Sequence, residues 1–298
     1  MKFGDIALAC CPPTLWGISY ALAKPATDHF PPIFMMAMVY ALTAIALYRP
    51  NRQARTPPKY LFLIAAFGGA IQSSLIFTGI SGLPASTAIL AVQAQVPFAV
   101  LAAWIIGGER LEVKRLVGIG ISGIGIIVIA GAPETIGNLL SLSFVLLGTL
   151  SWGISQGLAR RLGRDSGPTL TAAIMTYAAP QMLVASLVLE SGQITAIQTA
   201  SWHDWFAVVL LSIGGFAIAY SIWYGLLQRH RIDQIAPFAL LMPFIGVLVS
   251  VAALGEQLSA GAAIGGGVIV LGLAVIVLDR RPNQNAIESD QMNDAVQR

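Results

Sequence analysis

Long apolar segments, separated by short polar or glycine- and proline-containing connections, make up almost all of the chain up to residue 278. Each segment has roughly 17–23 residues, about the length a helix needs to cross the hydrocarbon core of a bilayer. A helix also satisfies its own backbone polar groups where no water is available. The pattern predicts an all-α membrane protein with ten transmembrane helices, at 5–23, 32–48, 60–80, 84–106, 114–131, 142–160, 168–189, 205–227, 233–254 and 259–278.

The composition supports this interpretation. The 298 residues are 56% hydrophobic and only 10% charged, whereas a soluble domain carries about 25% charged residues. The mean hydropathy is +0.75. Too few polar side chains are present to cover a water-facing globule. The polar segment 279–298 is the exception, and its composition predicts a disordered tail.

The positions of Lys and Arg predict the orientation. With ten helices and both termini on the same side, Lys24 is the one residue among 17 Lys and Arg that falls on the opposite side. Cytoplasmic loops carry an excess of Lys and Arg, so both termini and the tail are expected in the cytoplasm. The first segment also fits a secretory signal peptide, an alternative that the repeat described next disfavours. We expect the adjacent Cys10 and Cys11 to be packed thiols.

Two groups of motifs occur twice in the chain. Segment 14–19, with the sequence TLWGIS, returns at 149–155 as TLSWGIS. Further along each half, the segments VPF and GERL at 96–98 and 108–111 return as MPF and GEQL at 242–244 and 255–258. A glycine-rich helix follows each time, and we expect Gly118, Gly120, Gly123, Gly125 and Gly265–Gly267 to form helix contacts. The sequence therefore predicts two five-helix repeats, 1–137 and 138–278.

Because five is odd, the second repeat must be inverted in the membrane relative to the first. Inverted repeats place a substrate site near the midplane between the halves, where rocking gives alternating access. This architecture favours a transporter over a receptor, a scaffold or a membrane-embedded enzyme. An enzyme would need clustered His, Asp or Cys within the spans, and the sequence has no such cluster, no phosphate-binding loop and no nucleophile motif.

The order, duplication and inversion of these motifs resemble the drug/metabolite transporter superfamily, in its ten-helix, EamA-type exporter branch. The resemblance covers about residues 5–278. It implies a multi-pass protein of the bacterial inner membrane that exports small metabolites, with no cofactor, no metal and no nucleic-acid partner. Within this branch, the content of aromatic and amide side chains resembles that of the amino-acid exporters, including those for aromatic amino acids. A broad-specificity drug or nucleotide-sugar carrier of the same fold is the alternative.

Polar and aromatic side chains in the middle of the predicted spans are the candidates for cargo binding. Trp16 and Tyr20 lie four residues apart, so they share a helix face. Trp152 and Gln156 repeat this spacing at the matching place in the second half. A glutamine amide in hydrocarbon is costly unless it has a partner or lines a wet cavity. The complete predicted set is Trp16, Tyr20, Gln72, Ser73, Phe77, Gln95, Trp152, Gln156, Tyr220, Tyr224 and Met242.

Each of these side chains also has a purely structural interpretation, as packing or as a hydrogen bond between helices. Gln93 and Gln95 point about 200° apart on a helix, so we expect only one of them to face cargo. Glu109 and Glu256 are expected to cap or brace short turns. No acid lies near the middle of a predicted span, whereas proton-driven pumps use intramembrane carboxylates. The sequence therefore favours facilitative transport.

Overall fold

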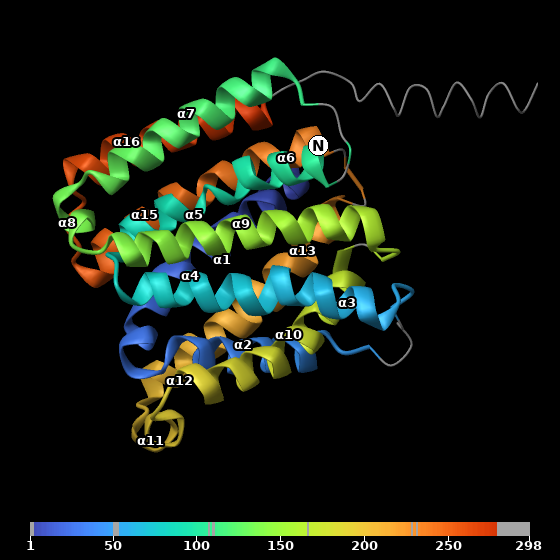
Figure 1. The fold of residues 1–298 in the computed structure, drawn as a ribbon, viewed down its shortest axis with the longest axis vertical. Coiled ribbons are helices and arrows are strands. Elements are labelled where there is room, and N and C mark those ends of the chain that lie inside the picture. Colours follow the sequence, from blue (N-terminus) through green and yellow to red (C-terminus); the bar gives the residue numbers. More distant parts are fainter. Residues whose placement is uncertain are drawn as a thin grey trace, which may run out of the picture.

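The computed structural model describes residues 3–49, 54–106, 108, 111–165, 167–227, 229–230 and 232–278. Within these ranges every regular element is a helix, and the long helices lie side by side (Figure 1). Nine of the described helices are long and apolar enough to cross a membrane, and α2 (Pro32–Leu47) is a shorter apolar helix beside them. The predicted all-helical membrane fold is confirmed. Glu109 and the segment 279–298 lie outside the described residues.

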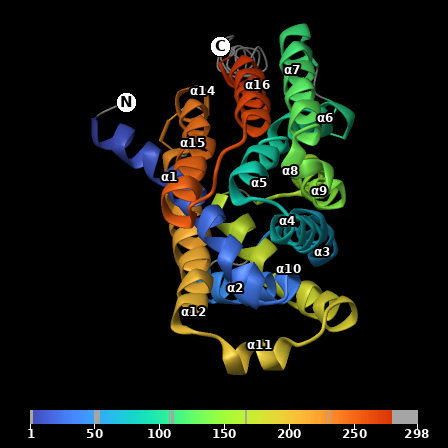
Figure 2. The same cartoon turned by 90° about the vertical axis from the view of Figure 1, so that its left-hand side faces the viewer.

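Helices from both halves of the chain make up the bundle (Figure 2). The first half contains α1 (Phe3–His29), α2, α3 (Pro58–Ala65), η1 (Ala66–Ala70), α4 (Ile71–Ser81), α5 (Ala85–Val92), α6 (Gln95–Ile105) and α7 (Val113–Ala130). After the short α8 (Pro133–Ile136), the second half contains α9 (Leu139–Leu162), α10 (Gly167–Leu189), α11 (Gln193–Thr199), α12 (Trp202–Val209), η2 (Leu210–Ile218), α13 (Ala219–Leu227), α14 (Ile232–Ile235), η3 (Ala236–Leu240), α15 (Leu241–Leu254) and α16 (Ala260–Val277).

Four spans are interrupted, at matching places in the two halves. The third span changes to a π-helix at η1 and the eighth at η2, and each π segment contains a Gly-Gly pair. The fourth span breaks between α5 and α6, just before Pro97, and the ninth has the 3₁₀ segment η3 just before Pro243. Proline removes a helix hydrogen bond, and π segments occur often at functional sites. The irregular spans are therefore a feature of the repeat.

The packing of the helices has the same inverted symmetry. Helix α1 packs most extensively on α15, and α9, its counterpart, packs on α6. Helix α1 also packs on η2 and α13, while α9 packs on η1 and α4. In the contacts α2–α10 and α7–α16, the two helices are counterparts of each other, so the inversion maps each contact onto itself. Every major contact therefore has an inverted equivalent, as two inverted repeats require.

Glycines bring the backbones of α7 and α16 into direct contact. A Cβ atom on Gly125 would lie 2.6 Å from the carbonyl oxygen of Gly265, and one on Gly265 would lie 2.8 Å from that of Gly125. Gly118 and Gly272 form a second reciprocal pair. Small residues allow this approach between membrane helices. The expectation was wrong for Gly120, Gly123 and Gly267, where a Cβ would meet nothing within 4 Å, because these residues lie on the faces turned away from the partner helix.

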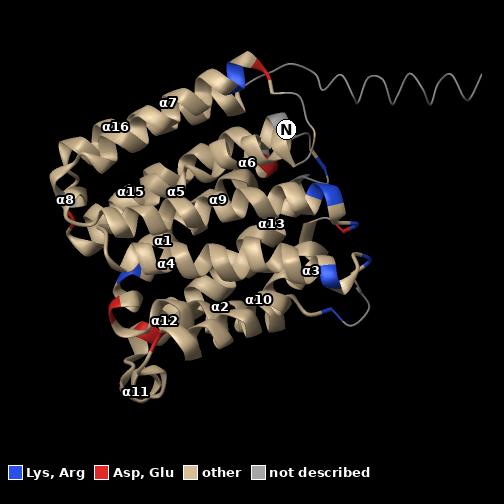
Figure 3. Ribbon diagram, in the orientation of Figure 1, with Lys and Arg blue, Asp and Glu red and all other residues tan. Residues whose placement is uncertain are grey.

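Charged residues gather at the two ends of the bundle (Figure 3). By the helix ends beside which they stand, we call the end with Arg55, Lys59, Lys114 and Arg160 the basic end, and the end with Asp28, Glu190, Asp204 and Glu256 the acidic end. Lys24 also lies at the acidic end, where its ammonium group donates to the carbonyl oxygen of Ser81 at 2.5 Å. A cation at the C-terminal end of a helix interacts favourably with the helix dipole.

At the basic end, Asp165 connects the two halves of the chain. Its carboxylate accepts hydrogen bonds from the backbone N–H groups of Arg55 (2.9 Å) and Thr56 (2.7 Å). Partial burial raises the pKa of Asp165, but these hydrogen bonds outweigh burial and hold the pKa below its usual range. Nearby, the Asp5 carboxylate lies 3.1 Å from the imidazole of His230.

The glycine pairs predict a difference between two neighbouring substitutions on α7. Gly125→Ala should lower the free energy of unfolding by about 1–3 kcal/mol, because the new methyl group overlaps the backbone of α16. Gly120→Ala should leave it unchanged or slightly raised, because alanine favours a helix more than glycine does. Thermal unfolding of the purified variants in detergent measures both. Equal melting temperatures for the two variants would contradict the glycine contact.

Candidate functional site

Aromatic side chains connect α1 to the eighth span in the interior of the bundle. The Trp16 ring lies 5.3 Å from the ring of Tyr220 and 5.5 Å from that of Trp223, both on α13. Tyr220 in turn stacks on Phe216 of η2 and on Tyr224, each at 5.9 Å. Ring pairs with these separations interact favourably beyond their burial. The structure thus brings together three of the predicted residues, Trp16, Tyr220 and Tyr224.

The third span joins this group through one further stack and one polar cluster. Phe77 of α4 stacks on Tyr20 of α1 at 5.6 Å. One turn earlier on α4, the Ser73 hydroxyl donates to the Gln72 side-chain carbonyl oxygen at 3.1 Å. The Tyr40 hydroxyl of α2 lies 2.7 Å from the Ser73 hydroxyl and donates to the same Gln72 oxygen at 3.5 Å.

Tyr40 closes these contacts into a ring, because its own ring lies 5.3 Å from Phe216. The contacts run from α1 to α4, α2, η2 and α13 and back to α1. We call this set the aromatic circuit; its members are Trp16, Tyr20, Tyr40, Gln72, Ser73, Phe77, Phe216 and Tyr220. It takes helices from both halves and contains no charged side chain. It offers aromatic faces, four hydroxyl groups and an amide.

Two buried polar atoms of α1 have no partner in the described part of the chain. The indole N–H of Trp16 and the hydroxyl of Ser19, one turn later on α1, are buried without a hydrogen bond among the described residues. In the other half, the counterpart Ser155 donates to the carbonyl oxygen of Ile64 at 2.9 Å. A buried polar group without a partner costs free energy. The α1 side of the bundle therefore carries buried polar atoms without a partner among the described residues.

Four predicted residues make no such contact with the circuit. Trp152 and Gln156 lie half-buried on α9, and no ring contact or hydrogen bond links them to it among the described residues. Gln95 is half-buried at the start of α6. Met242 is buried in the same apolar core as Trp16 and Tyr20, with its carbonyl oxygen against Gly17. Their roles in cargo binding stay predictions.

The contacts of Gln93 bear on the choice between Gln93 and Gln95. The Gln93 side chain is 2% exposed, and its amide donates to the carbonyl oxygen of Ile89 in its own helix at 3.4 Å. Its hydrogen-bonding capacity is therefore partly used within α5, whereas the half-buried Gln95 makes no such bond among the described residues.

Tyr40, Phe216 and Trp223 were not in the predicted set. Phe216 and Trp223 look like ordinary apolar residues of a hydrophobic run. The sequence position of Tyr40 could have identified it, because Tyr40 lies eight residues into α2, away from the membrane interface where Tyr usually anchors a helix.

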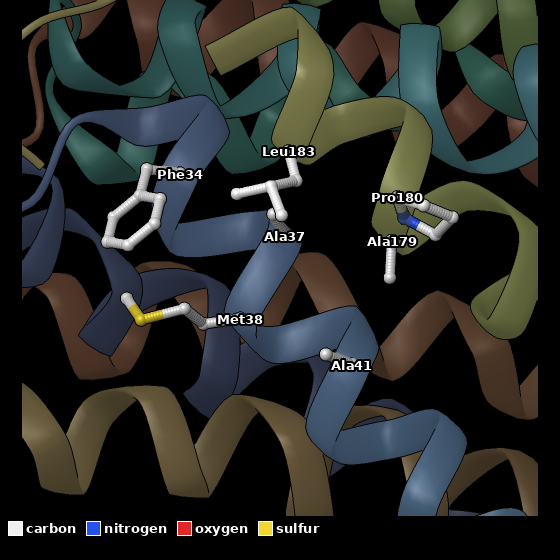
Figure 4. A pocket seen from close by; sticks show the side chains of 7 residues that line it. All are labelled: Phe34, Ala37, Met38, Ala41, Ala179, Pro180 and Leu183. Carbon is white, nitrogen blue, oxygen red and sulfur yellow. The ribbon is translucent and has the colours of Figure 1, made fainter. Parts of the chain in front are cut away.

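A cavity of about 330 Å³ lies elsewhere, between α2 and α10 (Figure 4). Its walls are apolar: Phe34, Ala37, Met38, Ala41, Ala179, Pro180 and Leu183. None of these residues belongs to the aromatic circuit. With no polar side chain to orient a polar molecule, the cavity is a poor candidate for the site. In the described part of the chain, no group of three His, Cys, Asp or Glu side chains is placed to hold a metal ion.

Comparison with known families agrees with the fold and its duplication. The profile of the EamA-like transporter family matches residues 4–131 and matches again at residues 139–278. The chain belongs to the EamA-like transporter family. The resemblance inferred from the duplicated motifs is therefore confirmed, and the chain is a multi-pass transporter of the inner membrane that acts on small molecules.

Individual relatives are distant but extend over nearly the whole chain. A protein of Salmonella typhimurium described as a probable amino-acid metabolite efflux pump is 26% identical, over 96% of this chain and 99% of its own length. An uncharacterized inner membrane transporter of Escherichia coli, YedA, is 24% identical over 89% of this chain and 88% of its own length. A crystal structure at 22% identity shares the fold, with a TM-score of 0.60 over 95% of this chain and 100% of that chain.

The polar cluster predicts a contrast between two tyrosines of the second span. Tyr40→Phe should lower the free energy of unfolding by about 0.5–1.5 kcal/mol, because Ser73 and Gln72 lose a buried hydrogen-bond partner. Tyr48→Phe should have no measurable effect, because Tyr48 is 69% exposed at the end of the span. Thermal unfolding in detergent compares the two. A loss of stability in Tyr48→Phe, or none in Tyr40→Phe, would count against the cluster.

Proposed function

We propose that this transporter exports amino acids, including aromatic ones, and related small metabolites by alternating access through a central cavity. The observation that carries the proposal is the aromatic circuit, which is built from both inverted halves and has hydroxyl and amide groups among its rings. Inverted-repeat transporters bind cargo near the midplane, between the halves.

The chemistry of the circuit suits this class of cargo. The faces of Trp16, Tyr20 and Tyr220 are suited to stack on an aromatic side chain, and they also attract a cationic amino group. The Gln72 carbonyl oxygen already accepts from Ser73 and Tyr40, which leaves its amide N–H groups to donate to a carboxylate. A nucleotide-sugar carrier would need cations for the phosphates, and no charged side chain belongs to the circuit. The Salmonella relative's description supports the same class.

The irregular spans supply a means of movement. The π segments η1 and η2 lie in the two spans that carry the Gln72–Ser73 pair and Phe216. The break before Pro97 and the 3₁₀ segment before Pro243 lie in the neighbouring spans. We infer that the halves rock about the circuit and bend at these places. No carboxylate lies in the middle of a described span, so transport is proposed to be facilitative and non-enzymatic.

Transport by purified protein in liposomes tests the cargo. A labelled panel should show flux of tryptophan, phenylalanine and tyrosine down their gradients, with a rate that an imposed pH gradient changes little. Gln72→Ala or Trp152→Ala should lower the initial rate about tenfold, the order expected from losing a buried hydrogen bond or stacking contact, at an unchanged inserted amount. Trp104→Ala is the matched control, because Trp104 lies 47% exposed on α6.

Different failures of this experiment have different meanings. Absence of flux for every amino acid would overturn the proposed cargo. Normal flux in both the Gln72 and Trp152 variants would show that these two side chains do not bind it. Concentrative transport driven by a proton gradient alone would contradict the facilitative mechanism.

The proposed direction requires both termini in the cytoplasm, with the acidic end in the periplasm. Reporter fusions after Ser81, Thr135 and Gln193 should then all behave as periplasmic, because these residues follow the third, fifth and seventh spans. A fusion after Arg164, in the connection to the seventh span, should behave as cytoplasmic. A cytoplasmic signal at any of the first three positions would disprove the orientation or the span count there.

A further inference from the structure

A carboxylate from the second half caps a helix of the first half at the acidic end. Glu190 follows directly after α10. Its two side-chain oxygens accept hydrogen bonds from the backbone N–H groups of Ile33 (2.8 Å) and Phe34 (2.9 Å) in the first turn of α2. Carboxylate hydrogen bonds to a helix N-terminus are stronger than neutral ones and also benefit from the helix dipole.

Glu256 makes the same arrangement on a second pair of helices. It follows α15, and its two oxygens accept from the backbone N–H groups of Ala85 (2.6 Å) and Ser86 (2.9 Å) at the start of α5. Gly255 has a φ of +68°, a left-handed conformation that glycine adopts easily and that commonly ends a helix. This turn directs Glu256 toward α5. Glu256 was expected to cap or brace a short turn. In the structure it caps the first turn of a helix in the opposite half.

The capped helices have no cap of their own. Both α2 and α5 are preceded by proline, Pro31 and Pro84, and neither has a side-chain cap from its own N-cap residue. The N–H groups of a first helical turn have no partner inside the helix. In α2 and α5 these groups therefore depend on glutamates that lie in the other half of the chain. At the end of a bundle, water is able to replace a glutamate, so the bonds are reversible.

We propose that Glu190 and Glu256 act as the gate at the acidic end, holding the two halves together there and releasing when the halves rock apart. The proposal rests on the alternating-access mechanism proposed above and goes beyond it, because it assigns the residues that close one end. Each carboxylate joins one helix end of the second half to one helix start of the first. Opening this end separates α10 from α2 and α15 from α5, which breaks all four hydrogen bonds.

Among the described residues, the other end of the bundle is held differently. Asp165 also accepts two backbone hydrogen bonds across the halves, but its donors Arg55 and Thr56 precede α3 in a connecting segment. A connecting segment is able to move with its carboxylate while the helices separate. The two glutamates instead accept hydrogen bonds from the first turns of helices, so their partners move with the spans themselves.

Labelling of a single cysteine tests the gate without any cargo. In a Cys10→Ser, Cys11→Ser background, Phe77→Cys serves as reporter, because Phe77 is 1% exposed near the acidic end of α4. A membrane-impermeant maleimide is added from the acidic side of oriented vesicles. Glu190→Ala and Glu256→Ala should each raise the labelling rate about tenfold, the order expected from losing charge-assisted hydrogen bonds. Glu190→Gln and Glu256→Gln should give smaller increases, since one oxygen acceptor remains.

Asp204→Asn is the matched control. Asp204 is a carboxylate at the same end, but it caps its own helix α12 together with Ser201, so its loss should leave labelling unchanged. If an alanine variant fails to insert, the glutamine variants give the test. Unchanged labelling in all inserted Glu190 and Glu256 variants, or an equal increase in Asp204→Asn, would overturn the gate. Labelling needs no cargo, so a wrong cargo assignment leaves this result unaffected.

Discussion

Direct backbone contact between helices is the interaction on which the rest of the structure depends. In a bilayer the hydrophobic effect does not drive one helix onto another, so close packing and polar contacts must hold the bundle together. Gly17 lies against the backbone of α15 and Gly153 against that of α6. Because these residues are counterparts in the inverted halves, one packing solution is used twice, and the aromatic circuit is built from both copies.

The two copies differ in the hydrogen bonds made by their first helices, α1 and α9. On the α9 side, Ser151 and Ser155 donate to carbonyl oxygens of the third span, at Phe67 and Ile64. On the α1 side, Leu15 takes the place of Ser151, and the Ser19 hydroxyl has no partner among the described residues. The α9 side of the bundle is thus joined to the third span by hydrogen bonds. The α1 side carries most of the aromatic circuit, and its buried Trp16 indole N–H and Ser19 hydroxyl have no partner among the described residues.

The candidate site was predictable in part. Seven of the predicted side chains are recognisable in the sequence as polar or aromatic residues in apolar runs, and the structure groups them through ring contacts and hydrogen bonds. They are Trp16, Tyr20, Gln72, Ser73, Phe77, Tyr220 and Tyr224. Tyr40 belongs to the second span, in which the paired motifs predicted no site residue. Which side chains meet depends on the rotation and crossing of helices. That geometry comes from glycine contacts between segments distant in the sequence, which periodicity along one helix does not reveal.

The sequence by itself determined the helical membrane fold, the duplication, the inversion and the family. Each follows from local physics: the cost of unpaired backbone groups in lipid sets the helices, and an odd number of spans per repeat forces the second repeat to be inverted. Only the tertiary structure decided which helices meet. It placed Glu190 and Glu256 on the first turns of α2 and α5, and Tyr40 on Ser73. The two glutamates join the halves, and all three contacts link residues more than 30 positions apart in the sequence, so no local pattern encodes them.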